Sequence, residues 1–127
     1  MFYNDILKDI RCHVGYTMDE DLKKDIRKIK NSCVSLVNNG EIFLFGSIAK
    51  GRYKDNSDID ILILVNEEKD LKELRILRHT LEDRVEQLKL SHNADIKVYS
   101  KKRYIELTRT ASFEQAIIKD LIDIKEW

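Results

Sequence analysis

Two short apolar runs separated by a polar segment constrain this chain more than any other feature. The runs, Ile42–Phe45 and Ile59–Val65, are apolar except for Asp60 and are flanked by polar or glycine residues. This pattern is typical of interior strands that are covered on both faces. The segment between them begins with Gly46-Ser47, and the second run opens on the pair Asp58 and Asp60. Because residues two apart in a strand point to the same face, both carboxylates should project side by side.

This arrangement indicates a particular chemistry. Two carboxylates held close together repel each other, and one takes up a proton unless a cation lies between them. Oxygen ligands of this kind suit Mg²⁺, which completes its shell with water and substrate phosphates. Upstream, Gly46 and Ser47 are predicted to form a tight turn that opens a short helix, where backbone N–H groups and a hydroxyl can bind phosphate. Together these features predict a nucleoside triphosphate site.

The bulk properties exclude several classes of protein. A chain of 127 residues predicts one domain. Its 23 basic and 23 acidic residues balance, which argues against a protein that mainly binds nucleic-acid backbone. Cys12 and Cys33 lack metal-like spacing and are expected to be reduced thiols of a cytoplasmic protein. No apolar run is long enough to span a bilayer, and no signal-peptide pattern opens the chain.

Hydrophobic periodicity predicts an alternating series of helices and strands. A capping box from Thr17 to Glu20 should start the second helix, and Gly40 should end it in a left-handed conformation. The predicted helices cover residues 2–13, 17–39, 69–90 and 112–125, with a helical turn or helix within 101–109, and the predicted strands cover 42–45, 59–65 and 94–99.

The third predicted strand carries a further carboxylate. Ile96 and Val98 must face the core, so Asp95 should lie on the other face of the sheet. We therefore predict an α/β (α+β) fold: a small mixed sheet of three or four strands with helices packed on it. One domain, residues 1–127, would comprise N-terminal helices (1–40), a catalytic core (41–99) and C-terminal helices (100–127).

The central motif resembles that of a known superfamily. Gly46-Ser47, ten residues and then Asp58-x-Asp60 resembles the signature of the DNA polymerase beta-like nucleotidyltransferases. The small size and the fuller string are similar to the minimal nucleotidyltransferase (MNT) branch, short proteins often encoded beside a HEPN-domain partner in prokaryotic toxin–antitoxin pairs. The resemblance extends from about residue 41 to 99. The family's third carboxylate, on a later strand, matches Asp95.

The resemblance implies the nucleotidyltransferase fold and a role for each motif residue. Gly46 and Ser47 would hold the β- and γ-phosphates of ATP, while Asp58, Asp60 and Asp95 would bind two Mg²⁺ ions. Asp95 would also help to deprotonate the acceptor hydroxyl that attacks the α-phosphorus, so that AMP is transferred and pyrophosphate leaves.

The sequence departs from the family pattern at one position. Many relatives carry Arg or Tyr directly after the Gly-Ser pair, where this chain has Ile48. A phosphate or base contact from that position is therefore lost. Lys50, Arg52 or Lys54 would have to supply a cation in its place.

The branch resemblance implies an enzyme that adenylylates a tyrosine of a cognate HEPN toxin and so acts as its antitoxin. Two alternatives stay open: an antitoxin that neutralises its partner by binding alone, and a small-molecule adenylyltransferase of the antibiotic-modifying type. RNA polymerisation fits worst, given the zero net charge. The motif reads neither the nucleotide base nor the acceptor. It also leaves open homo- or hetero-oligomers and whether residues 1–40 serve the core or a partner.

Overall fold

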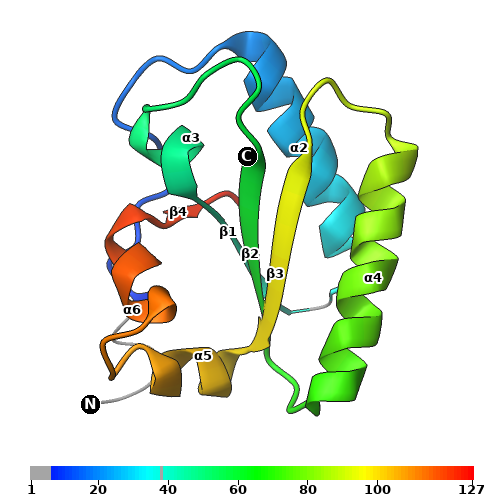
Figure 1. Cartoon of the computed structure of the whole chain (residues 1–127), viewed down its shortest axis with the longest axis vertical. Helices are drawn as coiled ribbons and strands as arrows, with labels where there is room; N and C mark the ends of the chain where they lie inside the picture. The colour runs from blue at the N-terminus through cyan, green and yellow to red at the C-terminus, as the bar shows by residue number, and fades with distance from the viewer. Residues whose placement is uncertain (1–6, 38) are drawn as a thin grey trace.

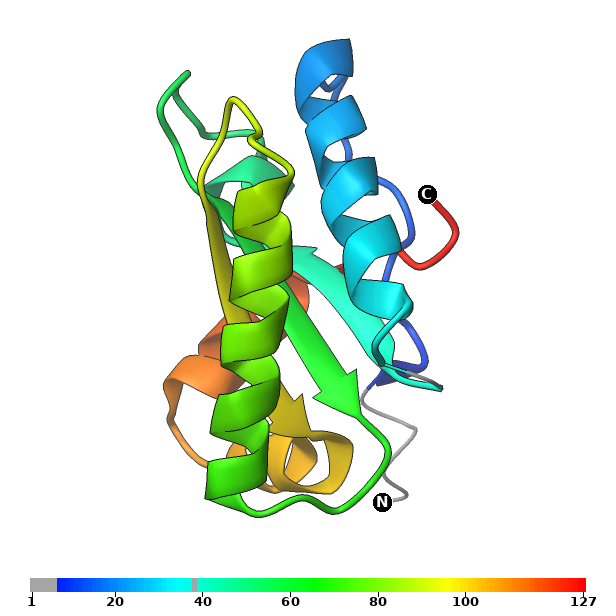
Figure 2. The same cartoon turned by 90° about the vertical axis from the view of Figure 1, so that its right-hand side faces the viewer.

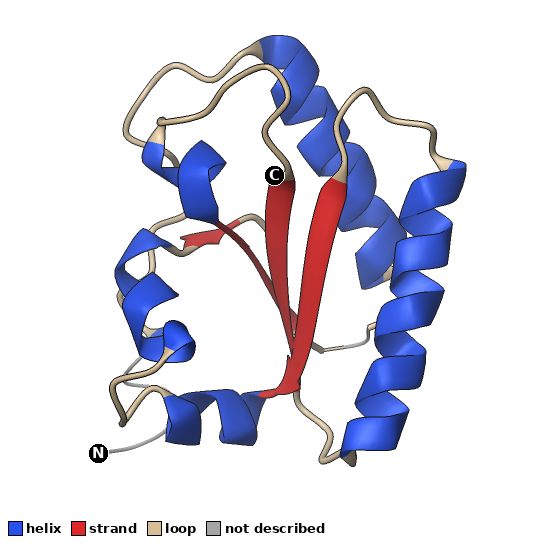
Figure 3. Cartoon of the chain, in the orientation of Figure 1, coloured by secondary structure: helices blue, strands red, loops and turns tan. Residues whose placement is uncertain are grey.

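A four-stranded sheet in the order β3-β2-β1-β4 organises the chain. The computed structural model describes residues 7–37 and 39–127. Figure 1 shows the sheet with its helices, and Figure 3 separates helices from strands by colour. The elements are α2 (Glu20–Val34), β1 (Glu41–Phe45), α3 (Gly46–Lys50), β2 (Ile59–Val65), α4 (Leu71–Gln87), β3 (Ala94–Ser100), α5 (Lys101–Leu107), α6 (Phe113–Ile117), the 3₁₀ helix η1 (Ile118–Asp120) and β4 (Ile122–Asp123).

The sheet is mixed, which confirms the predicted fold class. β1 runs antiparallel to β2 and to β4, whereas β2 and β3 are parallel. A parallel pair needs a long crossover connection, and α4 provides it. The β1–β2 connection instead carries the motif loop and α3, so the motif residues lie at one end of the two central strands.

The period-two alternation of the strands gives each face of the sheet its own core. Ile59, Ile61 and Ile63 pack on the face covered by α2 and α4, which lie side by side in Figure 2. Leu62 and Leu64 pack on the opposite face, with residues of α5 and α6. Asp60 follows the same alternation as Leu62, so it lies on this second face, at the edge of its apolar core.

Helix α2 begins and ends at other residues than predicted. Its N-cap is Asp19, whose carboxylate accepts a hydrogen bond from the N–H of Leu22 at 3.3 Å, so Thr17 does not open the helix. The left-handed residue after the helix is Asn39 (φ 59°), and Gly40 has no positive φ. Gly40 is needed for a different reason, because a Cβ there would overlap the side chain of Val37.

Helix α4 forms as predicted but is shorter than 69–90. Asp70 and Glu73 make a reciprocal capping box at its start. Leu74 and Leu81 are buried, whereas Leu71 is 78% exposed. Leu71 is the first residue of the helix, and the first side chain of the helix that is buried is Leu74, one turn later. No helix in the described part of the chain is long and apolar enough to cross a membrane.

Both ends of the chain differ from the prediction. The helix predicted over 2–13 lies partly outside the described residues, and it does not extend to residue 13. Arg11 instead forms a parallel bridge with Ile122, and its carbonyl accepts the N–H of Asp123 at 2.7 Å.

The final helix predicted over 112–125 is also wrong. It ends at Ile117, and after η1 the chain continues as β4, which pairs with the free edge of β1. Ile122 and Ile124 are fully buried in the core between the sheet and α2. These two isoleucines are two residues apart, so a strand buries both of them on one face, although the apolar residues of the segment also have helical spacing. The region 100–127, predicted to be all helical, therefore contains a strand.

Candidate active site

Three carboxylates come together at one end of strands β2 and β3. Asp60 and Asp95 are direct partners in the parallel pairing of these strands, and Asp58 lies exposed immediately before β2. Burial raises the pKa of Asp60 from 3.8 to about 6; the charges of Asp95 and Asp58 also raise it, and that of Lys97 opposes them. The charges of Asp58 and Asp95 are therefore close enough to act on Asp60.

Gly46 lies directly against this group. Its φ is 78°, in the left-handed region that favours glycine, and it follows Phe45, the β1 partner of Asp60. A Cβ on Gly46 would overlap Oδ2 of Asp60 and lie 3.0 Å from its Cγ. Only glycine allows the backbone that carries Ser47 to approach the carboxylate this closely.

Helix α3, which begins at Gly46, is held in place by Tyr16. The Tyr16 hydroxyl donates a 2.6 Å hydrogen bond to the carbonyl of Ile48, whose side chain is completely buried. Burial in the core gives a structural reason for isoleucine at the position where relatives carry Arg or Tyr. Sequence reasoning missed Tyr16, which lies 32 residues away from Ile48 and outside any motif.

Of the cations considered as substitutes, one is paired with another carboxylate and the other two, Arg52 and Lys54, are exposed. Lys50 forms an ion pair with Asp120 at 3.4 Å, and Lys54 is exposed in the loop before Asp58. Ser57 closes a turn, because its hydroxyl accepts the N–H of Lys54 at 2.9 Å while its own N–H donates to the Lys54 carbonyl at 3.0 Å. This closed turn delivers the chain into Asp58.

A partly buried histidine ties the start of β3 to α2. His92 Nδ1 lies 2.9 Å from Oδ2 of Asp25, and their side chains are only 16% and 12% exposed. The next residue, Asn93, accepts the N–H of Ile59 at 2.8 Å through its carbonyl. The pair thus anchors the loop that sets β3 against β2. The sequence carries no signal for it, since the two residues are 67 positions apart.

The donor set fits a hard divalent cation, because all three predicted ligands are carboxylates. Within residues 7–37 and 39–127, no three His, Cys, Asp or Glu side chains already form a metal-binding group. Asp95 instead leans toward Lys97, with 3.8 Å between Oδ2 and Nζ, while Asp60 faces Gly46. The three carboxylates are therefore close to one another but do not point at a common centre, and their side chains would have to turn to bind one ion.

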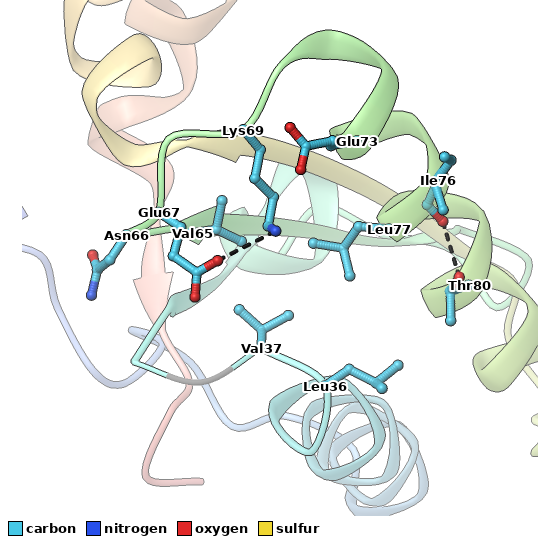
Figure 4. Close-up of a pocket in the computed structure, with 10 residues that line it drawn as sticks. All are labelled: Leu36, Val37, Val65, Asn66, Glu67, Lys69, Glu73, Ile76, Leu77 and Thr80. Carbon is cyan, nitrogen blue, oxygen red and sulfur yellow. Dashed lines mark hydrogen bonds and ion pairs between the residues drawn. The ribbon is translucent and has the colours of Figure 1, made fainter.

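A pocket of about 370 Å³ lies elsewhere, between the α2 end, the β2 end and the first turns of α4. Figure 4 shows Val37, Val65 and Leu77 pointing into it, with an ion pair between Lys69 and Glu67 at 3.3 Å. Val65 ends the strand that begins next to Asp60. The pocket is therefore at the opposite end of β2 and does not belong to the carboxylate site.

The described geometry agrees with comparisons with known proteins. The model of the nucleotidyltransferase domain family matches residues 26–123, which includes all five motif residues named above and every element from the middle of α2 to β4. The chain therefore belongs to the nucleotidyltransferase domain family.

A curated relative points in the same direction. It is Putative protein adenylyltransferase MJ0141 from Methanocaldococcus jannaschii, which is 43% identical over 54 residues. The aligned segment covers 42% of this chain and 50% of the relative, so the chain spans about half the length of the protein it matches.

Proposed function

We propose that this chain is a Mg²⁺-dependent protein adenylyltransferase that moves AMP from ATP to a hydroxyl group. One observation carries the proposal: Asp60 pairs directly with Asp95 and touches the space that a side chain at Gly46 would need. The predicted metal ligands and the predicted phosphate turn are thus neighbours at one end of the sheet. The name of the curated relative supports adenylyl transfer to a protein.

Each motif residue has a role in this proposal. The backbone N–H groups at Gly46 and Ser47, with the Ser47 hydroxyl, would bind the β- and γ-phosphates. Asp58, Asp60 and Asp95 would hold two Mg²⁺ ions, which supply the positive charge that neutralises the phosphates and the attacking oxygen. The raised pKa of Asp60 supports this role, because a carboxylate that is partly buried and close to like charges gains most from a nearby cation.

The transfer is a displacement at the α-phosphorus. Asp95 accepts the proton of the acceptor hydroxyl, whose oxygen forms a bond to the α-phosphorus. The bond from the α-phosphorus to the bridging oxygen breaks, and pyrophosphate leaves with the electron pair. Gly46 and Ser47 hold the leaving group, and the product carries AMP in a phosphodiester bond.

The acceptor that we propose is a tyrosine of a HEPN-domain partner encoded beside this chain, in the cytoplasm. Adenylylation would silence the partner, and this chain would act as its antitoxin. The proposal rests on the resemblance of the Gly-Ser…Asp-Ile-Asp string to the MNT branch.

Intact-mass measurement of the partner tests this function. The partner, incubated with ATP, Mg²⁺ and this chain, should gain the mass of one AMP. Asp60→Asn should abolish the gain, because it removes a charged ligand without changing the side-chain shape. Asp83→Asn, the same replacement at an exposed position on α4, should leave it intact. A partner that stays unmodified but is still neutralised, equally by Asp60→Asn, would contradict the proposal and favour neutralisation by binding alone.

A further inference from the structure

Phe113, the first residue of α6, is a large apolar side chain that remains 46% exposed. Its ring packs edge-on against Phe45 of β1, with 6.0 Å between centroids and an interplanar angle of 77°. Nζ of Lys97 from β3 also lies over this ring, 5.4 Å from its centroid. The same Nζ is 3.8 Å from Asp95. One ring therefore contacts the strands on both sides of β2.

The strand register places this ring beside the carboxylates. Phe45 pairs with Asp60, and Lys97 is the β3 partner of Leu62. A side chain that reaches both Phe45 and Lys97 must cross β2 at the level of Asp60 and Leu62, on the face where these two point. Leu62 is fully buried there. The open part of the Phe113 ring therefore borders the carboxylate cluster.

The position of Phe113 is fixed by its surroundings. The Ser112 hydroxyl caps α6 by accepting the N–H of Gln115 at 3.2 Å. The backbone carbonyl of Glu114 accepts the Tyr104 hydroxyl at 3.1 Å, and its carboxylate accepts the Tyr99 hydroxyl at 3.4 Å. These bonds hold the backbone of α6, and the contacts with Phe45 and Lys97 restrict the ring itself, so the exposed ring loses little conformational freedom when another group packs on it.

The order of the strands indicates which substrate meets this ring. Gly46 and Ser47, where pyrophosphate would leave, follow β1, whereas Asp95 and Lys97 lie on β3, across β2. In an in-line displacement, the attacking and leaving oxygens are on opposite sides of the phosphorus. The attacking hydroxyl should therefore arrive from the β3 side, where Lys97 and Phe113 are.

We propose that Phe113 and Lys97 form the acceptor-binding surface of this site, an inference that rests on the function proposed above. The Phe113 ring packs against a planar acceptor, and the Lys97 ammonium contacts the acceptor oxygen next to Asp95. A phenolic hydroxyl satisfies both contacts, because it joins a flat ring to an oxygen that becomes negative as its proton leaves. An aliphatic hydroxyl gains nothing from the ring.

Adenylyl transfer to two small probes tests the proposal. N-acetyltyrosinamide should be a better acceptor than N-acetylserinamide. Phe113→Ala should raise the KM for the tyrosine probe about tenfold and leave the KM for ATP unchanged, since one aromatic contact is of that order. Phe113→Leu keeps the packing against Phe45 and should show the same split. The control is Leu71→Ala, which truncates a more exposed apolar residue on α4 and should change neither KM.

Saturation-transfer NMR with Mg²⁺ and a non-hydrolysable ATP analogue reads probe binding without chemistry. The ring protons of N-acetyltyrosinamide should receive saturation from the wild-type protein and lose it in Phe113→Ala and Lys97→Gln. A probe that binds the wild type but never receives AMP would refute the proposed function and leave the acceptor surface standing. Equal KM values for the tyrosine probe in wild type and both Phe113 variants, or a rise in the KM for ATP instead, would overturn the acceptor assignment.

Discussion

Replacing Gly46 by alanine separates the two demands that the motif places on this position. The first is the backbone conformation, because a φ of 78° costs an alanine about 1–2 kcal/mol. The second is space, because the new Cβ would overlap Oδ2 of Asp60. The carboxylate is the movable end of a side chain, so it can turn away at little further cost. We expect Gly46→Ala to lower the free energy of unfolding by about 1–3 kcal/mol.

The expected effect on transfer is much larger than the effect on stability. A carboxylate displaced by about 1 Å leaves its ligand position, and misplacement of that size costs on the order of a hundredfold in rate. Gly51→Ala is the matched control. Gly51 has nearly the same φ, 75°, and a Cβ there would lie 2.9 Å from Cδ1 of Tyr16 instead of meeting a carboxylate. It should lose similar stability and retain most of its activity.

Two measurements on the two glycine variants separate the loss of stability from the loss of activity. Urea unfolding gives the loss of stability, and pyrophosphate release under conditions where both variants are folded gives the rate. Equal rates for Gly46→Ala and Gly51→Ala would refute the reasoning, because activity would then follow backbone strain and not the position of Asp60.

Three further predictions concern the surroundings of the site. In metal-free protein, the raised pKa of Asp60 makes the folded state bind more protons than the unfolded state between pH 3.8 and about 6. The free energy of unfolding should therefore fall as pH rises through this window. Asp60→Asn should flatten that slope, as measured by urea unfolding in the presence of EDTA. His92→Ala should cost about 1–3 kcal/mol in urea unfolding, because it leaves Asp25 partly buried without its partner, whereas His79→Ala, from an exposed pair, should cost below about 0.5 kcal/mol. Tyr16→Phe should lower the thermal stability by an amount equivalent to about 0.5–1.5 kcal/mol, since it removes one hydrogen bond to α3, and an unchanged unfolding temperature would contradict that role.

Local patterns were sufficient to predict the centre of the fold. Ile59–Val65 forms a strand with the predicted limits. Its apolar residues, interrupted only by Asp60, can be buried only in an interior strand or a buried helix, and polar residues flank the segment closely. The alternation at Ile96 placed Asp95 on the face opposite the α2/α4 core, and the structure pairs it with Asp60. The roles of these carboxylates stay predictions.

Features that depend on distant parts of the chain could not be predicted. β4 is two residues long, and only the free edge of β1 and the burial of Ile122 make it a strand. His92 meets Asp25, and Phe113 meets Lys97, through the fold alone. Gly40 looked like a helix cap because of its residue type, but close packing against the Val37 side chain and the Leu64 backbone carbonyl is what requires it. In each case a long-range contact prevails over a local preference.

A crystal structure of the protein with Mg²⁺ and a non-hydrolysable ATP analogue is the most direct test of the proposed site. We expect two ions bound by the carboxylates of Asp58, Asp60 and Asp95, with the β- and γ-phosphates at the backbone of Gly46 and the hydroxyl of Ser47. Nucleotide bound elsewhere, or ions that contact none of the three aspartates, would contradict the assignment of this cluster as the catalytic centre.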